Sequence, residues 1–477
     1  MSRSALHAIA IDLGAESGRV IEGVLKDGAL NLYELHRFPT RQVRLMDHDY
    51  WDVFSIYDEI KRALAEYGAQ RRTRQQSIGV DSWGVDFALL GRDGSILGLP
   101  SSYRDKRTKG VMPRFLKLVP KHRVYQLTGI QFLPINTLYQ LYSMVRDKSP
   151  LLEVATDLLF IPDLFNYLLS GSRVTEYTMA TTSQLYDAAK CEWAGELFAA
   201  MGLPVSLMQE VVGPGSIIGK LRMDLHRETG FPVCRVIATA SHDTASAVAA
   251  VPARGDDWMF ISSGTWSLVG VETTTPNTSS LALKYNFTNE GGVGGRVRLL
   301  KNVTGLWLLN QLATADGVKP ADYASLVAAA GREPGLKMLM DPDSAVAGET
   351  KLPAGTAAAR ARCILDSLAL KYRQVLDQLR RVYLKPLNRI HVVGGGARNR
   401  LLCQLTADAT GLPVYAGPVE ATAVGNAMVQ AMALGHVSSL DEIRSVVRRS
   451  FEVKQYRPRP TREWDKAYER FCELVPK

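Results

Sequence analysis

The chain has 477 residues, of which 46% are hydrophobic and 22% are charged, with 57 basic and 48 acidic side chains. This length exceeds what one hydrophobic core usually serves, so two domains of roughly 200 to 250 residues each are expected. No tract rich in Ser, Gln, Pro or acidic residues indicates disorder, and the basic residues are too scattered to indicate nucleic-acid binding.

The five cysteines lie far apart and form no C-x-x-C pair, which argues against a disulfide framework and against a zinc site. The N-terminal apolar run is interrupted by Asp12, unlike a signal peptide. No uncharged apolar run reaches the ~18 residues of a membrane span. We therefore expect a cytoplasmic protein with neither a membrane nor a nucleic-acid partner.

The first predicted element is a hairpin in "AIAIDLGAESGRVIEGVL", residues 8–25. Gly14 in its turn can adopt positive φ, so that backbone N–H groups converge on an anion, and Ser17 adds a hydroxyl donor. Asp12 supplies a carboxylate that can hold a divalent metal ion. Taken alone, the pattern also fits a plain structural hairpin.

Two further stretches of the first half predict strands that end in polar loops. Residues 76–90 predict a strand, a loop and a strand, and residues 231–251 predict a strand, a loop and a helix of small residues. "SHDTASA" places His242 and Asp243 in the second loop, where open α/β sheets bind their ligands. Asp243 there suits a general base, although helix capping by Asp243, Thr244 or Ser246 explains the spacing as well.

The second half begins with a hairpin of the same kind. "WMFISSGTWSLVGVE", residues 258–272, repeats the Gly-x-x-Ser turn with Gly264 and Ser267, but carries Ser262 where the first hairpin has its aspartate. "VPARGDD", residues 251–257, precedes it and reads as a linker. The repetition predicts two related domains that face each other across a cleft.

A long helix is predicted over residues 357–384, and residues 389–411 predict a strand, three glycines and an amphipathic helix closed by Gly411. Glycines at 394–396 let a flat ring or a phosphate approach the backbone, although a tight turn that only packs helix on sheet needs them too. The G-x-G-x-x-G fingerprint of dinucleotide binding is not met.

Together these pieces predict an α/β protein that transfers a phosphoryl group from a nucleotide to an alcohol. Neither the P-loop signature nor the protein-kinase signatures occur. The segments "DLGAESGR", "SHDTASA", "SSGTWS" and "VVGGGARN" resemble the FGGY carbohydrate kinases. This resemblance implies two related actin/hexokinase-like ATPase (ribonuclease H-like) domains, with ATP and Mg²⁺ as cofactors. Residues 1–250 would carry the sugar, phosphate and metal side, and residues 251–477 the nucleotide side.

The resemblance also implies a role for individual residues. Asp243 would be the catalytic base, and Asp12 would lie beside the metal ion. The ATP-binding positions would be Ala15, Glu16, Ser17, Gly18, Arg19, Thr265, Asn310, Gly395 and Gly396. The sugar-binding positions would be Gly84, His242, Asp243, Thr244 and Asn302. Glu16 and Asn310 depart from the residues that relatives place there.

Longer stretches such as "GVDSWGVDFALL", "GIQFLPINTLYQL" and "NEGGVGGRVRLLKNVTGLWLL" resemble the branch of the family that phosphorylates L-rhamnulose to L-rhamnulose 1-phosphate in rhamnose catabolism. The implied partners are therefore L-rhamnulose and ATP. One alternative is a family member acting on another ketose or polyol, such as L-fuculose, xylulose or glycerol. An alternative of another class is a non-catalytic, actin-like or Hsp70-like protein gated by a nucleotide.

Overall fold

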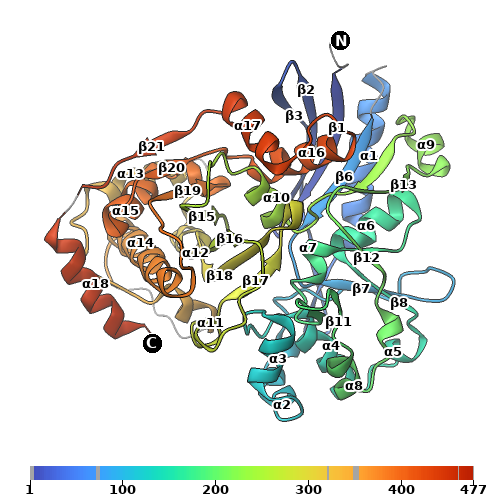
Figure 1. Ribbon diagram of the computed structural model, residues 1–477, viewed down its shortest axis with the longest axis horizontal. Coiled ribbons are helices and arrows are strands. Elements are labelled where there is room, and N and C mark those ends of the chain that lie inside the picture. Colours follow the sequence, from blue (N-terminus) through green and yellow to red (C-terminus); the bar gives the residue numbers. More distant parts are fainter. Residues whose placement is uncertain (1–4, 71–75, 320–321, 348–353, 460, 476–477) are drawn as a thin grey trace. The chain divides into compact units, whose positions relative to one another are not determined.

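The computed structural model describes residues 5–70, 76–319, 322–347, 354–459 and 461–475. The chain, drawn in Figure 1, forms two compact units. By their residue ranges, it passes between them five times. The first unit comprises Met1–Ala250, Glu272–Leu299 and Thr422–Ser450, and the second comprises Val251–Val271, Leu300–Ala421 and Phe451–Lys477. The units thus interleave along the sequence. The division of the chain into two domains at residue 250 stays a prediction.

The first unit is built on a six-stranded sheet with the order β13-β14-β6-β1-β2-β3. Its strands are β1 (Leu6–Leu13), β2 (Ser17–Lys26), β3 (Ala29–Pro39), β6 (Ser77–Ser82), β13 (Ser216–Lys220) and β14 (Arg235–Ala238). Strands β1 and β2 are the predicted hairpin, and β1 is parallel to β6, which is parallel to β14. The carboxyl ends of these three parallel strands therefore lie at one edge of the sheet.

Helices α1 (Val53–Gln70) and α6 (Ile161–Ser170) pack on this sheet. The apolar core between them includes Ile9, Ile11, Ile60, Leu164 and Phe165, all fully buried. The predicted helix of small residues is α10 (Asp243–Ala249). It packs closely on α16 (Ala421–Ala433), since a Cβ added at Gly425 would lie 1.8 Å from the Ser246 carbonyl oxygen.

The second sheet has seven strands in the order β17-β18-β16-β15-β19-β20-β21. They are β15 (Trp258–Ser263), β16 (Trp266–Thr273), β17 (Thr288–Gly291), β18 (Val297–Thr304), β19 (Arg389–Val393), β20 (Val414–Ala416) and β21 (Lys454–Tyr456). Strands β15 and β16 form the predicted second hairpin, and β15 is parallel to β19. The segment predicted as a linker, residues 251–257, has no regular structure, yet Val251 and Ala253 are buried.

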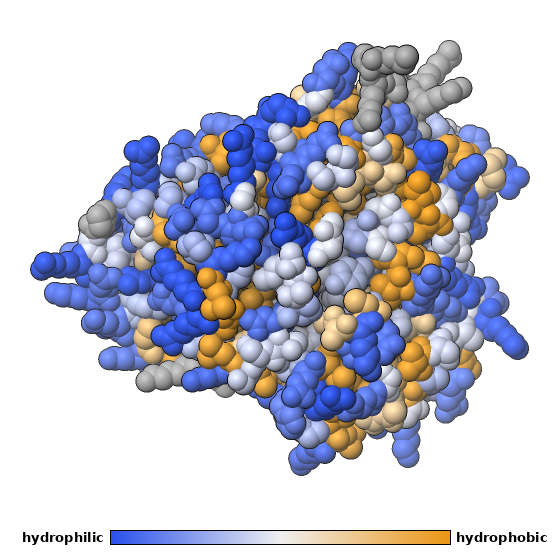
Figure 2. Space-filling model, viewed as in Figure 1, coloured by the Kyte–Doolittle hydropathy of each residue, from blue (hydrophilic) through white to orange (hydrophobic). Residues whose placement is uncertain are grey.

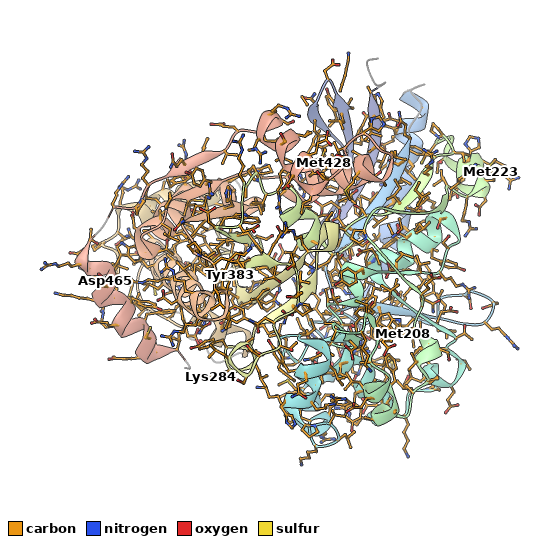
Figure 3. All side chains as sticks on the ribbon, viewed as in Figure 1. Met208, Met223, Lys284, Tyr383, Met428 and Asp465 are labelled. Atoms are coloured by element: carbon orange, nitrogen blue, oxygen red, sulfur yellow. The ribbon has the colours of Figure 1, made fainter. Side chains whose placement is uncertain are left out.

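The centre of the second unit is the predicted long helix, α14 (Ala357–Val382), which Thr356 caps by accepting a hydrogen bond from the Ala359 N–H. Helices that pack against it include α12 (Trp307–Ala315), α13 (Tyr323–Arg332), α15 (Arg400–Thr410) and α18 (Arg462–Leu474). Tyr383, labelled in Figure 3, follows α14 and donates a hydrogen bond to the Asp256 carbonyl oxygen at 3.0 Å.

The remaining strands and α-helices complete the fold. The strands are β4 (Gln42–Leu45), β5 (His48–Trp51), β7 (Phe87–Leu90), β8 (Asp157–Phe160), β9 (Thr175–Glu176), β10 (Tyr186–Asp187), β11 (Glu192–Trp193) and β12 (Val211–Val212). The helices are α2 (Val111–Phe115), α3 (Lys121–Thr128), α4 (Thr137–Arg146), α5 (Leu151–Val154), α7 (Tyr177–Ala180), α8 (Gly195–Met201), α9 (Met223–Thr229), α11 (Ser280–Lys284) and α17 (Leu440–Ser450). Hydrophilic residues predominate on the face in Figure 2. In the described part of the chain, every helix is too short or too polar to cross a membrane.

Candidate active site

Three carboxylates lie at or just beyond the carboxyl ends of the parallel strands of the first unit. Asp12 on β1 pairs in register with Asp81 on β6, and Asp243 begins α10 just after β14. The Ser82 N–H donates to the Ser241 carbonyl oxygen at 2.8 Å, which ties the end of β6 to the loop that carries Asp243. The sequence analysis proposed Asp12 and Asp243 but missed Asp81, although Asp81 also lies near the end of a buried strand.

Asp81 is the most deeply buried of these carboxylates. Burial raises its pKa well above the ordinary value, and the negative charge of Asp12 raises it further. Asn426 stabilises the ionised form by donating to Asp81 Oδ2 at 2.5 Å. Within the described residues no hydrogen bond reaches Oδ1, so one buried oxygen is left for a ligand.

Next to the first turn, the Asp12 carboxylate forms an ion pair with Arg19. The Gly14 N–H donates to the Ser17 carbonyl oxygen at 3.0 Å, and Glu16 points outward with its side chain 52% exposed, 4.0 Å from Arg104. The expectation that Gly14 and Gly264 adopt positive φ is wrong. A Cβ added at Gly14 would lie 3.1 Å from the Ser17 carbonyl oxygen, so close approach within the turn is what favours glycine there.

The loop that carries the proposed base is held by several buried partners. His242 is the N-cap residue of α10, and its side chain makes no capping bond, so Asp243 does not serve as the cap. Thr244 Oγ1 donates to Asp243 Oδ1 at 3.0 Å, and His242 Nε2 lies 3.5 Å from the same oxygen. Asp243 remains partly exposed, with one third of its side chain accessible.

Behind this loop lies Glu176, which sequence reasoning also missed. Its Oε2 accepts hydrogen bonds from the Ser241 N–H at 3.1 Å and from the Thr178 N–H at 2.9 Å. Thr178 Oγ1 in turn accepts from the His242 N–H at 3.0 Å. Burial raises the pKa of Glu176 to about 7. Glu176 therefore fixes the backbone on which the proposed base stands.

Gly84 lies in the loop between β6 and β7, where Val85 adopts φ +70°. Positive φ is a strained conformation for a β-branched residue. The loop is held by Asp86, whose Oδ2 accepts from the indole N–H groups of Trp51 at 2.6 Å and Trp83 at 3.0 Å. Its Oδ1 accepts from Gln140 Nε2 at 2.8 Å. Burial nevertheless raises the pKa of Asp86 to about 6.

In the second unit, Thr265 lies in the turn between β15 and β16, where the Gly264 N–H donates to the Trp266 carbonyl oxygen at 2.8 Å. The Thr265 carbonyl oxygen accepts from the N–H groups of Gly305 and Trp307, both at 3.2 Å. The turn is thereby bonded to the start of α12, which carries Asn310 one turn further on. Asn302 lies on β18, just before these residues.

The three glycines after β19 differ in what surrounds them. Gly394 adopts φ +81°, which explains its glycine. A Cβ added at Gly396 would lie 2.0 Å from Ser263 Oγ, so packing against the end of β15 requires glycine there. Around Gly395 no atom of the described structure lies within 4 Å of an added Cβ. Gly395 is thus the position open to a ligand.

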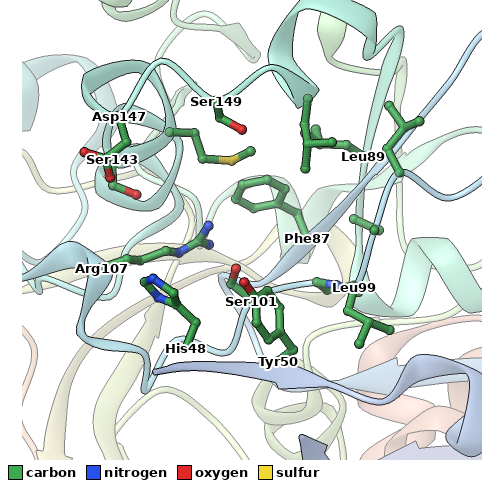
Figure 4. Close-up of a pocket in the computed structure, with 16 residues that line it drawn as sticks. His48, Tyr50, Phe87, Leu89, Leu99, Ser101, Arg107, Ser143, Asp147 and Ser149 are labelled. Atoms are coloured by element: carbon green, nitrogen blue, oxygen red, sulfur yellow. The ribbon is translucent and has the colours of Figure 1, made fainter. Parts of the chain in front are cut away.

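A cavity of about 240 Å³ also opens in the first unit (Figure 4). Arg107 points into it and donates to Gln140 Oε1 at 2.6 Å. Its lining includes His48, Tyr50, Phe87, Arg107, Ser143 and Asp147, and none of the predicted site residues. Among the described residues, no group of three or more His, Cys, Asp or Glu forms a metal site by itself.

Comparison with known proteins matches both halves of the chain to one family. Residues 7–250 match the model of the N-terminal domain of the FGGY family of carbohydrate kinases, and residues 259–434 match its C-terminal domain. A rhamnulokinase of Bacteroides thetaiotaomicron is 43% identical, over 98% of this chain and 99% of that protein. A rhamnulokinase of Pectobacterium carotovorum is 42% identical, over 98% of this chain and 96% of that protein.

Solved structures of more distant proteins share the fold. A gluconate kinase from Lactobacillus acidophilus superposes with a TM-score of 0.85 at 16% identity, covering 99% of this chain and 98% of that one. A glycerol kinase from Plasmodium falciparum, solved with ADP, gives a TM-score of 0.81 at 15% identity, with 99% of each chain covered.

Proposed function

The chain belongs to the FGGY family of carbohydrate kinases, and we propose that it transfers the γ-phosphoryl group of ATP to the 1-hydroxyl of L-rhamnulose. The predicted family, fold class and carbohydrate kinase activity are confirmed by these matches. The substrate is proposed because the rhamnulokinase relatives align over nearly the whole chain. A nucleotide-gated protein without catalytic activity is not favoured.

The observation that carries the reaction is the position of Asp243. Its carboxylate is partly exposed, and both Thr244 and His242 approach the same oxygen, Oδ1. Oδ2 then accepts the proton of the sugar hydroxyl as the hydroxyl oxygen bonds to the γ-phosphorus, while the bond from that phosphorus to the β–γ bridging oxygen breaks and ADP leaves. General-base assistance of this kind contributes about 10²- to 10⁴-fold to the rate. Gly84, His242, Thr244 and Asn302 are proposed to orient the sugar.

Mg²⁺ fits the first unit because two carboxylates, Asp12 and Asp81, lie side by side in register and Asp81 Oδ1 is buried without a hydrogen bond from the described residues. One or two carboxylates suffice, since Mg²⁺ takes its other ligands from water and substrate phosphates. The bound ion would neutralise charge on the phosphates. Asp12 also forms an ion pair with Arg19.

ATP is proposed to contact both hairpin turns. Backbone N–H groups and the Ser17 hydroxyl of the first turn, Ala15 to Arg19, suit phosphate oxygens. Thr265 in the second turn, Asn310 on α12, and Gly395 and Gly396 after β19 suit the rest of the nucleotide, because Gly395 leaves its surroundings open. We also propose that residues 1–250 form mainly the sugar, phosphate and metal side and residues 251–477 mainly the nucleotide side, and that the enzyme acts in the cytoplasm.

The test is a comparison of kcat/KM for L-rhamnulose, L-fuculose, L-xylulose, D-xylulose, L-ribulose and glycerol, measured by ADP release with ATP and Mg²⁺. L-rhamnulose is expected to exceed each of the others at least tenfold, since each unpaired hydroxyl contact costs about 1–3 kcal/mol. Phosphorus NMR of the product should show the phosphate on the 1-oxygen. A competitor that matches L-rhamnulose would overturn the substrate but leave the kinase activity intact.

A further inference from the structure

A buried arginine in the first unit contacts the histidine beside the proposed base. Arg298 on β18 is fully buried, and its Nη2 lies 3.1 Å from His242 Nδ1. Its Nε donates to the Gly291 carbonyl oxygen at 2.7 Å, and its Nη1 lies 3.3 Å from Glu290 Oε2. Burying a guanidinium is costly unless it is paired and well hydrogen-bonded, so we looked for a role that requires an arginine at position 298.

The contact decides which imidazole nitrogen carries the proton. A guanidinium has only donors, so the nitrogen it faces at 3.1 Å must be an acceptor. This contact therefore favours the tautomer of His242 that has its proton on Nε2. Glu290 Oε2, 3.4 Å from the same Nδ1, would favour the opposite tautomer, but it lies farther away and is paired with Arg298.

The Nε2–H faces the proposed base, because Nε2 lies 3.5 Å from Asp243 Oδ1. That distance is long for a hydrogen bond, and such contacts often shorten when substrate binds. Thr244 Oγ1 donates to the same oxygen. Among the described residues no hydrogen bond reaches Oδ2. The Thr244 hydrogen bond and the nearby His242 Nε2 thus both favour one orientation of the carboxylate.

We infer that Arg298 is a positioning residue: it fixes the Nε2–H tautomer of His242, which orients Asp243 so that Oδ2 faces the sugar hydroxyl. The inference rests on the proposed function of Asp243 as the base. A purely structural Arg298 would stabilise the fold without any need for one tautomer.

The test is the double variant Arg298→Met with Glu290→Gln. It removes both charges, so that no unpaired charge remains buried. The matched control is Arg444→Met with Glu272→Gln. That pair is also buried, and Arg444 Nη2 donates to Glu272 Oε2 at 2.5 Å and lies 3.4 Å from the Val248 carbonyl oxygen on α10. The control thus affects the same helix without touching His242.

Nitrogen-15 NMR of histidine-labelled apoprotein reads the tautomer, with the His242 signal assigned by its loss in His242→Asn. The wild type and the control pair should show the Nε2–H form, and the Arg298 pair should gain Nδ1–H. The kcat of the Arg298→Met, Glu290→Gln variant should fall about tenfold with the KM for ATP unchanged, since part of the general-base contribution is lost. Arg298→Lys, which keeps the charge beside Glu290 but not the fork, should behave similarly if the double variant unfolds.

An unchanged His242 signal, or unchanged kcat despite a changed tautomer, would overturn the positioning role. Failure of the proposed function looks different: Asp243→Asn would then keep its turnover while the wild-type tautomer remained Nε2–H.

Discussion

The two hairpin turns have nearly the same sequence pattern but different surroundings. In the first, Asp12 stands beside Asp81 of the adjacent parallel strand. In the second, Ser262 stands beside Val393, and glycines follow that neighbouring strand. The second turn is also shorter by one residue, since Ser263 pairs with Ser267 whereas Leu13 pairs with Gly18. One backbone design thus offers charge in one unit and open space in the other.

Loss of the carboxylate after β14 should have the largest effect. Asp243→Asn keeps the shape but removes the proton acceptor, so kcat should fall ~10²-fold or more with both KM values nearly unchanged. Steady-state kinetics with either substrate varied measures this, and Asp93→Asn on an exposed turn serves as the control. Near-normal turnover would remove Asp243 from the base role.

Exchanging the residues that distinguish the hairpins tests the comparison directly. Asp12→Ser gives the first hairpin the residue type of the second, so the Mg²⁺ concentration for half-maximal activity should rise ~10-fold or more. Ser262→Asp should leave the Mg²⁺ requirement of the enzyme unchanged. A Mg²⁺ titration of both variants decides, and an unaltered requirement in Asp12→Ser would place the ion elsewhere.

The buried carboxylate behind the base loop should make stability depend on pH. Glu176 has an ordinary pKa of 4.5 that burial raises to about 7, so the native state keeps a proton that the unfolded state releases. The free energy of unfolding from this group therefore falls between pH 4.5 and 7, by about 3 kcal/mol, and is flat above. Urea unfolding of Glu176→Gln, which stays neutral, should lack this fall. Equal pH slopes for both proteins would contradict it.

Alanine substitutions at two adjacent glycines of the second unit should affect different properties of the protein. Gly396→Ala should destabilise the protein by about 1–3 kcal/mol, because its Cβ would overlap Ser263. Gly395→Ala should leave the melting temperature unchanged and raise the KM for ATP about 3- to 10-fold. Gly264→Val should also weaken ATP binding by filling space, without backbone strain. An unchanged KM for ATP in the Gly395→Ala and Gly264→Val variants would mean that these two glycines have only a structural role.

The smallest effect is expected for Glu16. Its exposed carboxylate lies near Arg104, and such surface pairs contribute less than about 1 kcal/mol. Glu16→Gln should change kcat and the KM for ATP less than about twofold in steady-state assays. A larger change would mean that this side chain turns toward the phosphates in the complex.

The hairpins, the helix of small residues and the glycine turn could be predicted because each follows from a local pattern of apolar, polar and glycine residues. Asp243 could be proposed from the sequence because it lies in the loop region after such a strand, at the start of the next helix. The contacts of Asp81, Glu176 and Arg298 could not be predicted, because they join segments far apart in sequence. The conformation of Gly14 was predicted wrongly, since a turn hydrogen bond formed there without positive φ.

The loop around Gly84 contains a pair of tryptophans whose optical signals can report on its conformation. The rings of Trp51 and Trp83 lie with centroids 4.2 Å apart, and both indole N–H groups bond the same oxygen of Asp86. Two indoles this close couple their electronic transitions, so they should give a paired band in circular dichroism and a characteristic fluorescence. Any ligand that moves this loop will change both signals, and binding can be followed without an attached dye or a coupled assay.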